Sequence, residues 1–221
     1  MKPAVVFFIR IVFFALLCCL CILASVVSLS APINLLVIFG GVLLTYPVVW
    51  LGRKVLDRDH TENHAAWTTT FVHCGMGMTL GIPIIRGVIT HDEWKLWRLP
   101  VAPEIGCFLV IVTGAAIFLV VATLALRGFG APFFLVLSRK LAVDWLYAWT
   151  RNPMVLAGLA FFFSLGIWFQ SLGFLIWVLI DFTPAMIFFL KVFEERELEF
   201  RFGASYLEYR SRTPMLWPRK P

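Results

Sequence analysis

Charged side chains are scarce in this sequence and are missing from long stretches of it. Asp, Glu, Lys and Arg make up 14% of the residues, whereas hydrophobic residues make up 61%. No charged residue occurs in 11–52, 105–126 or 152–180. Soluble domains are nearer half apolar and a quarter charged, so this composition excludes an ordinary soluble domain. Each stretch is long enough for one or two helices of the roughly 20 residues that cross a bilayer.

Several familiar signatures are also missing. No ten-residue alternation of apolar and polar residues predicts a membrane barrel, so the expected fold is an all-α, polytopic helical membrane bundle. The sequence contains no P-loop, His-Glu-x-x-His or Gly-x-Ser-x-Gly motif. The five cysteines lie in apolar segments without metal-ligand spacing, so they are interpreted as small buried hydrophobic residues and no metal site is predicted from them. A metal site in the polar loop of Asp57, Asp59, His60, Glu62 and His64 is the alternative to a simply solvated loop.

The apolar runs predict six membrane spans, with five as the alternative. Thr68, Thr69, Thr70 and His73 weaken the third span, and the count falls to five if that segment lies on the membrane surface. The expected spans are Ala4–Leu29, Ile33–Leu51, Ala65–Ile89, Val101–Leu126, Pro153–Phe169 and Gly173–Phe193, followed by a soluble tail, Glu194–Pro221.

The net charge of +6 comes from basic residues in the connections between the apolar runs. We therefore interpret these residues as topology signals and contacts with anionic lipids, and expect no nucleic-acid partner. With six spans and both termini in the cytoplasm, every Lys and Arg except Arg86, Lys95 and Arg98 lies at or near the inner face. A multi-pass protein with cytoplasmic termini is the expected topology. An isolated Arg10 in the first span is expected to snorkel to the interface.

The last two spans form a hairpin whose geometry points to a site. Arg151 precedes the short turn Gln170–Leu172 by about as many residues as Glu194 and Glu195 follow it. At a rise of about 1.5 Å per residue, both ends of the hairpin return to the same membrane face. Pro153 is suited to the first turn of a helix, where free backbone amides attract anionic or hydroxyl groups. A charged pocket at the membrane surface is therefore predicted.

The same residues carry a family resemblance. Arg151-Asn152-Pro153-Met154, the Glu194-Glu195 pair, the segment Phe202–Tyr209 and the element Pro214…Trp217-Pro218 follow one another in this order. With Gly128–Phe133 ahead of them, they resemble the isoprenylcysteine carboxyl methyltransferase and phospholipid methyltransferase superfamily. The chain departs from the family pattern at three places, with Trp145 for a Gly, Val155 for a Tyr, and a glycine one place late at Gly158.

The resemblance implies an integral-membrane methyltransferase that uses S-adenosylmethionine. It divides the chain into a variable membrane scaffold of about four spans, residues 1–126, and a methyltransferase core, residues 127–221. Arg151 would face the cofactor carboxylate, and Glu194 or Glu195 would hold its ammonium or ribose hydroxyls. The implied cofactor pocket consists of Tyr147, Arg151, Asn152, Pro153, Met154, Glu194, Glu195, Tyr206 and Tyr209.

Asp181 is the one charged residue between Arg151 and Lys191, in a helix that Pro184 is expected to kink. An intramembrane carboxylate is a candidate functional group, here for the head group of the methyl acceptor, alongside Arg151 as a catalytic candidate. The alternative is a protonated or hydroxyl-bonded structural residue.

The acceptor is expected to be a lipidic or apolar small molecule that enters from the bilayer. An anionic acceptor and a sulfonium neutralise each other during transfer, which a dry pocket favours. An amine needs a base, and no His follows His91, so a carboxylate or thiolate acceptor is favoured. A phospholipid amine is the alternative. A transporter, suggested by Arg10, Glu104 and Asp181, and a catalytically silent scaffold are the competing functions.

Overall fold

The structure, a computed structural model, describes residues 3–59, 61–126 and 141–220. Within these ranges the chain forms helices and turns, with one isolated bridge between Arg98 and Ser171 and no strand. The predicted all-α fold is confirmed.

The first three helical runs are α1 (Pro3–Val26); α2 (Ala31–Leu35), η1 (Leu36–Gly40), α3 (Gly41–Leu43) and α4 (Thr45–Leu56); and α5 (Glu62–Met76), η2 (Gly77–Gly81) and α6 (Ile82–Ile89). After η3 (His91–Trp94) come α7 (Pro103–Leu126), α8 (Leu146–Trp149) and α9 (Pro153–Trp168). The last run is α10 (Leu172–Trp177), η5 (Val178–Phe182), α11 (Thr183–Phe189), η6 (Leu190–Glu194) and α12 (Glu195–Phe202), and α13 (Ala204–Arg212) follows it.

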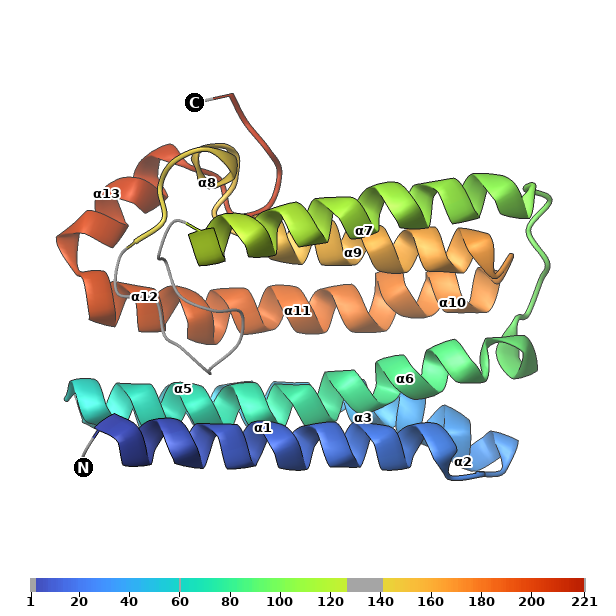
Figure 1. Cartoon of the computed structure of the whole chain (residues 1–221), viewed down its shortest axis with the longest axis horizontal. Helices are drawn as coiled ribbons and strands as arrows, with labels where there is room; N and C mark the ends of the chain where they lie inside the picture. The colour runs from blue at the N-terminus through green and yellow to red at the C-terminus, as the bar shows by residue number, and fades with distance from the viewer. Residues whose placement is uncertain (1–2, 60, 127–140, 221) are drawn as a thin grey trace.

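The helices lie in two layers along one long axis (Figure 1). One layer holds α1, α2–α4 and α5–α6, and the other holds α7, α9 and α10–α12. The core between them is apolar, with Phe174, Trp177 and Phe193 fully buried. Gly52 permits a close approach of α4 and α5 within one layer, because a Cβ there would overlap the Val72 side chain. Many large apolar side chains remain exposed on the outer helix faces, as expected where lipid is the solvent.

Five helical runs of the described residues are long and apolar enough to cross a membrane: Phe7–Val26, Ala31–Leu56, Glu62–Ile89, Pro103–Leu126 and Leu172–Phe202. The third span, predicted to be the weak one, is a run of 28 residues. The short helix is instead α9, whose 16 residues span about 24 Å, less than the roughly 30 Å of a hydrocarbon core. The fifth predicted span, Pro153–Phe169, is therefore present as helix α9, and it is this span, not the third, that falls short of membrane length.

Helix α9 packs along α7, which lies beside it over most of its length (Figure 1). Gly106 of α7 faces the backbone of Trp168, where a Cβ would overlap the Trp168 amide nitrogen and Cα. Thr113 of α7 donates a hydrogen bond to Ser164 of α9 over 3.4 Å. Helix α7 therefore covers one face of this short helix.

The last run is continuous but irregular. Residues 178–182 form a π turn ahead of Pro184, and the Thr183 hydroxyl donates to the Val178 carbonyl over 2.7 Å. A π turn next to a proline redistributes the carbonyls that lose their usual donor. The run continues to Phe202, and the chain then turns at Gly203, which has a φ of +52°. Glu194 and Glu195, where the predicted helical tail begins, therefore continue the last membrane helix without a break.

Two arginines are buried within the bundle. The prediction that Arg10 snorkels was wrong: its side chain is buried, with Nε donating to Thr70 Oγ1 over 3.2 Å. Arg86 is 3% exposed and donates to Asn34 Oδ1 over 2.8 Å and to the carbonyls of Ala24 and Val27. These bonds fasten α1 and α2 to the helical run α5–α6.

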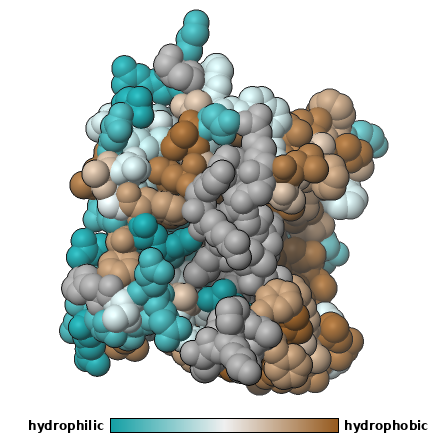
Figure 2. All heavy atoms as spheres, turned by 60° about the vertical axis from the view of Figure 1, so that its left-hand side comes forward, coloured by the Kyte–Doolittle hydropathy of each residue, from teal (hydrophilic) through white to brown (hydrophobic). Residues whose placement is uncertain are grey.

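Hydrophilic side chains gather at the end of the bundle that carries α12 and α13, beside a hydrophobic flank (Figure 2). Both ends of the chain lie toward this end (Figure 1). We call it the polar end.

Candidate active site

Arg151 is held at the polar end by backbone and side-chain contacts with the tail that follows α13. Its amide donates to the Pro214 carbonyl over 2.9 Å. The Met215 carbonyl accepts from Thr150 Oγ1 over 3.0 Å and from Asn152 Nδ2 over 3.1 Å. The tail element with its Pro and Trp residues therefore fixes the chain immediately before α9.

Helix α9 begins at Pro153, as predicted, with Asn152 as its N-cap residue. Asn152 gives no side-chain cap, because its amide group is bonded to the Met215 carbonyl instead. The first-turn amides of Met154 and Val155 are therefore left without that partner at the positive end of the helix.

The predicted meeting of Arg151 with the glutamate pair is present. Arg151 Nη1 lies 2.8 Å from Glu195 Oε1, and the two side chains are 10% and 12% exposed. The same Nη1 donates to the Tyr206 hydroxyl over 3.2 Å. Arg210 Nε approaches the other carboxylate oxygen of Glu195 at 3.6 Å. Arg151 Nε is buried and has no hydrogen-bond partner among the described residues, so one donor of the fork remains available.

A cavity of about 360 Å³ lies between the two layers beside Arg151. Its volume is within the usual range of small-molecule sites. The lining residues that the sequence predicted for the cofactor pocket are Tyr147, Arg151, Asn152, Pro153, Met154 and Glu194. The remaining wall consists of His73, Met76, Gly77, Leu80, Gly81, Ile84, Val155, Phe182, Met186 and Phe189.

The two glutamates of the pair occupy different positions. Glu195 is turned to Arg151 and Arg210 and is not part of the cavity lining. Glu194 ends the π turn η6, lines the cavity, and has no hydrogen-bond or ion-pair partner among the described residues. Of the two, Glu194 is the carboxylate that a ligand in the cavity would meet.

The tail tyrosines stand behind the cavity wall. Tyr209 donates to the Tyr147 carbonyl over 2.6 Å, and its ring lies 6.3 Å from that of Tyr206. Burial, followed by the nearby charge of Glu195, raises the pKa of Tyr206 to about 12. Burial likewise raises the pKa of Tyr147 and of Tyr209. These phenols are therefore neutral near pH 7 and serve as hydrogen-bonding groups that support Tyr147 and Arg151.

Asp181 does not join the predicted site. It lies on η5, and it is absent from the cavity lining although its neighbour Phe182 is part of it. Its Oδ2 atom is buried without a hydrogen-bond partner among the described residues. The structure thus separates Asp181 from Arg151, with which the sequence had grouped it.

His73 is the residue that sequence reasoning missed. It comes from α5, in the opposite layer from Arg151, and lines the same cavity. No motif surrounds it, and its position in the cavity follows only from the packing of one layer on the other. The glycines Gly77 and Gly81 were expected to serve helix packing, and a Cβ at Gly77 would indeed overlap Leu17 of α1.

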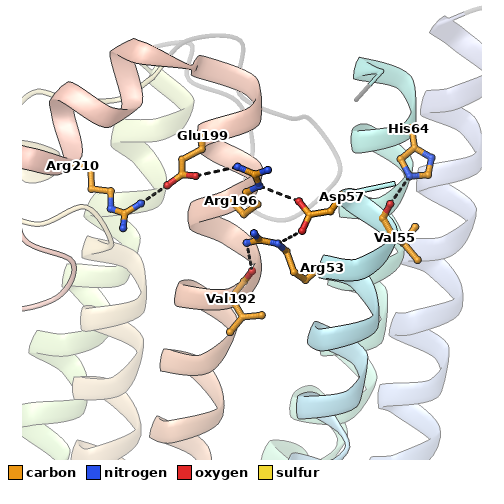
Figure 3. Close-up of polar contacts among 8 residues, drawn as sticks. All are labelled: Arg53, Val55, Asp57, His64, Val192, Arg196, Glu199 and Arg210. Atoms are coloured by element: carbon orange, nitrogen blue, oxygen red, sulfur yellow. Dashed lines mark hydrogen bonds and ion pairs between the residues drawn. The ribbon is translucent and has the colours of Figure 1, made fainter. Parts of the chain in front are cut away.

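A chain of charged side chains extends from the scaffold layer to this site (Figure 3). Asp57, just beyond α4, pairs with Arg53 at 2.5 Å and with Arg196 at 3.0 Å. Arg196 lies 3.4 Å from Glu199, which in turn pairs with Arg210, the partner of Glu195. Partial burial acts to raise the pKa of Asp57, but hydrogen bonds from the two arginines outweigh it and lower the pKa.

The polar loop before α5 was the alternative metal site. Asp57 is engaged with arginines, and His64 Nε2 lies 2.8 Å from the Val55 carbonyl (Figure 3). Among the described residues, no group of three or more His, Cys, Asp or Glu side chains is placed to hold a metal ion. His60 lies outside the described residues.

A second, almost wholly apolar groove of about 440 Å³ adjoins the cavity. It shares four lining residues with the cavity: Met154, Val155, Phe182 and Met186. Gly158 also lines it, and a Cβ at that position would meet nothing within 4 Å. The groove continues from the cavity between α7, α9 and α11.

Residues 101–205 match the family model of phospholipid methyltransferases. This segment, just under half of the chain, is similar to the phospholipid methyltransferase family. The family is part of the superfamily that the sequence resembled, so the predicted recognition is confirmed. The match implies a membrane methyltransferase, and it includes Arg151, Glu194 and Glu195 but not His73. No curated protein and no solved structure matches the chain. The predicted Gly128–Phe133 element lies outside the described residues.

Proposed function

We propose that the cavity beside Arg151 binds S-adenosylmethionine and that the protein transfers a methyl group to a lipidic acceptor from the membrane. The observation that carries this proposal is that Arg151 and Glu194 line one cavity. Within the part of the chain that the structure describes, Nε of Arg151 and the Glu194 carboxylate have no hydrogen-bond partner. The cofactor carries a carboxylate and an ammonium on its amino-acid part, so the free groups of the cavity complement it in charge.

Each polar group then has a separate role. Arg151 would bind the cofactor carboxylate, and Glu194 would bind the ammonium or a ribose hydroxyl. Glu195, Tyr206 and Arg210 would hold Arg151 from behind, because none of them lines the cavity. Asn152 and Pro153 would set the start of α9, whose free amides favour anionic or hydroxyl groups.

When bound, the cofactor supplies an electrophilic methyl group on a positively charged sulfur. Phe182, Phe189, Met76 and Met186 line the cavity and would exclude water from the reacting groups. Aromatic faces and thioethers are also compatible with a neighbouring cation. Holding two reactants in line can supply much of the rate acceleration, and the rigid helices of the cavity wall favour this.

The apolar groove would admit the acceptor. A lipid chain in the groove beside Gly158 would bring its reacting end to Met154 and Val155, which belong to both the groove and the cavity. The sequence favoured a carboxylate or thiolate because no His follows His91. That premise does not hold in the fold, since His73 lines the cavity. A phospholipid amine is therefore a full alternative to an isoprenylcysteine-type carboxylate.

We also infer that the polar end faces the cytoplasm. Arg53, Arg196, Arg201 and Arg210 gather there, and basic residues are retained on the cytoplasmic side of membrane proteins. Cysteine labelling from either side, at Arg212 for the polar end and at Leu96 for the other end, tests this topology.

Calorimetry on purified protein tests the cofactor site. Wild-type protein is expected to bind S-adenosylmethionine and its demethylated product in the micromolar range. Arg151→Lys retains the charge but loses the planar fork, and Glu194→Gln loses the charge; each is expected to weaken binding at least about tenfold. Arg212→Gln is the matched control, because the Arg212 side chain is 69% exposed and its ion pair is with the equally exposed Glu208.

A wild-type protein that binds neither compound would contradict the methyltransferase proposal. Ion or solute flux through the purified protein in liposomes would then favour a transporter. Absence of both binding and flux would favour a silent scaffold.

A further inference from the structure

His73 lies in the scaffold layer, outside the matched residues 101–205, yet it lines the cavity with Arg151 and Glu194. It stands on α5 in the span Glu62–Ile89. Among the lining residues it is the only imidazole, and the acidic and basic lining groups are Glu194, Arg151 and Tyr147. Its contribution to the chemistry therefore depends on which ring nitrogen is free.

The hydrogen bonds of His73 assign its tautomer. Nδ1 lies 2.8 Å from the Thr69 carbonyl oxygen, which can only accept. Nδ1 therefore carries the hydrogen in the neutral ring, and Nε2 carries the lone pair. Nε2 has no hydrogen-bond partner among the described residues. The ring meets Phe189 edge to face, with centroids 5.5 Å apart and planes at 87°.

The turn of α5 whose Thr69 carbonyl accepts from His73 is held in place by contacts with α12. Thr69 donates through its hydroxyl to Glu197 over 3.4 Å, and Glu197 is buried and pairs with Arg201 at 2.9 Å. These contacts tie the turn of α5 that carries the Thr69 carbonyl to α12. The imidazole is thus held by a backbone bond on one side and by Phe189 on its ring.

We propose that Nε2 of His73 is the general base of the methyl transfer, acting on a lipid acceptor that carries N–H at its reacting atom. The inference rests on the proposed function of the cavity and narrows its acceptor class. An imidazole with a free nitrogen has no task if the acceptor is already a carboxylate. An ammonium has no lone pair until it loses a proton, and with a pKa near 10 in lysine it needs a base to attack near neutral pH.

The step balances as follows. An acceptor ammonium first gives one proton to Nε2, which leaves a nitrogen lone pair and a positively charged imidazolium. That lone pair forms the new N–C bond while the S–C bond breaks. The electron pair of the broken S–C bond stays on the sulfur and neutralises its positive charge. The methylated ammonium leaves with its positive charge, and the imidazolium releases its proton before the next turnover.

His64 offers a matched control on the same helix. It precedes His73 by two and a half helical turns, so it faces the opposite side of α5. One of its nitrogens is likewise near a backbone carbonyl, that of Val55 at 2.8 Å (Figure 3). His64 is not among the residues that line the cavity.

The experiment measures transfer of a labelled methyl group from S-adenosylmethionine to vesicles of phosphatidylcholine containing phosphatidylethanolamine. Wild-type turnover is expected to rise with pH and then level off. His73→Gln is expected to lower turnover at least about 100-fold, the usual contribution of a general base, and to abolish the levelling. Binding of the demethylated cofactor, measured by calorimetry, is expected to be unchanged, and His64→Gln is expected to match wild type in both assays.

The outcomes separate this inference from the proposed function. Wild-type binding of the cofactor with transfer to an isoprenylcysteine carboxylate, but not to the amine lipid, would overturn the base and keep the methyltransferase. A His73→Gln protein with wild-type turnover would also overturn the base and keep the methyltransferase. A His73→Gln protein that loses cofactor binding along with turnover would assign His73 to cofactor binding instead. If His73→Gln does not fold, the wild-type protein decides alone: amine methylation independent of pH from 5.5 to 8 would overturn the proposal.

Discussion

Arg151 and Glu195 form a buried ion pair between the start of α9 and the last helical run, with Nη1 and Oε1 2.8 Å apart. Glu195 also faces Arg210 on α13, so one carboxylate is shared by two guanidinium groups. The pair leaves Nε of Arg151 without a hydrogen-bond partner within residues 3–59, 61–126 and 141–220. Glu195 therefore positions Arg151 and does not itself contact the cavity.

Glu195→Gln is expected to lower both stability and cofactor affinity. The substitution keeps the shape but leaves two guanidinium groups near the cavity without their shared negative charge. Loss of one partner of a buried ion pair is expected to lower the free energy of unfolding by up to about 3 kcal/mol. The loss is no larger because Arg151 still borders the cavity. Thermal unfolding with and without the demethylated cofactor measures both effects. Glu208→Gln, in an exposed pair, serves as the control, and a Glu195→Gln protein equal to it would contradict the assigned position.

Gly158→Phe is expected to reduce the use of the acceptor while cofactor binding persists. A Cβ at Gly158 meets nothing within 4 Å, so a larger side chain can extend into the apolar groove without disturbing the helix. The expected result is a rise in KM for a lipid acceptor of at least about tenfold, with unchanged calorimetric binding of the cofactor. Gly158→Ala separates the loss of glycine from the filling of the groove. Equal KM values for all three proteins would place the acceptor elsewhere.

Asn34→Ala is expected to destabilise the bundle without affecting the cavity. Asn34 Oδ1 accepts two hydrogen bonds from Arg86, which is 3% exposed and lies at the end of the bundle away from Arg151. Removal of an acceptor from a buried charged donor costs about 1.5–3 kcal/mol. The midpoint of thermal unfolding measures the loss. Ser25→Ala, which removes an exposed hydroxyl in α1, is the comparison that should remain near wild type.

High pH is expected to destabilise the protein through its tail tyrosines. The folded-state pKa of Tyr206, about 12, lies above the value of about 10 for an unfolded chain. Its contribution to stability is therefore complete below pH 10 and is lost as the pH rises towards 12. Tyr147 and Tyr209 act in the same direction. A spectroscopic titration of tyrosinate checks this: ionisation of all tyrosines near pH 10 in the folded protein would contradict it.

Much of the fold could be predicted because the bilayer imposes simple rules on sequence. Charge-free stretches became helices, and Pro153 opened α9 at the expected residue. The short turn at residues 170–172 returned the last run to the level of Arg151, which is why the Arg151–Glu195 contact could be predicted from chain length alone. The predicted bounds of the fifth span, Pro153–Phe169, likewise agree with α9 to within one residue.

The site was harder to predict where it depends on rotation and on layer packing. The π turn at residues 178–182 changes the helical phase, so counting residues does not tell which face Asp181 occupies. Arg10 was predicted to lie at the interface because its hydrogen-bond acceptor, Thr70, is 60 residues away in the sequence and cannot be recognised from it. His73 carries no local pattern at all, and its place beside Arg151 requires both layers to be assembled.

The hydrogen bond from the Arg151 amide to the Pro214 carbonyl joins the start of α9 to the last residues of the sequence. Residues 213–219 lie outside the five runs that are long and apolar enough to cross a membrane. A chain cut before Pro214 would therefore keep these runs but lose the backbone partner that aligns Arg151, so this truncation would separate membrane insertion from assembly of the site.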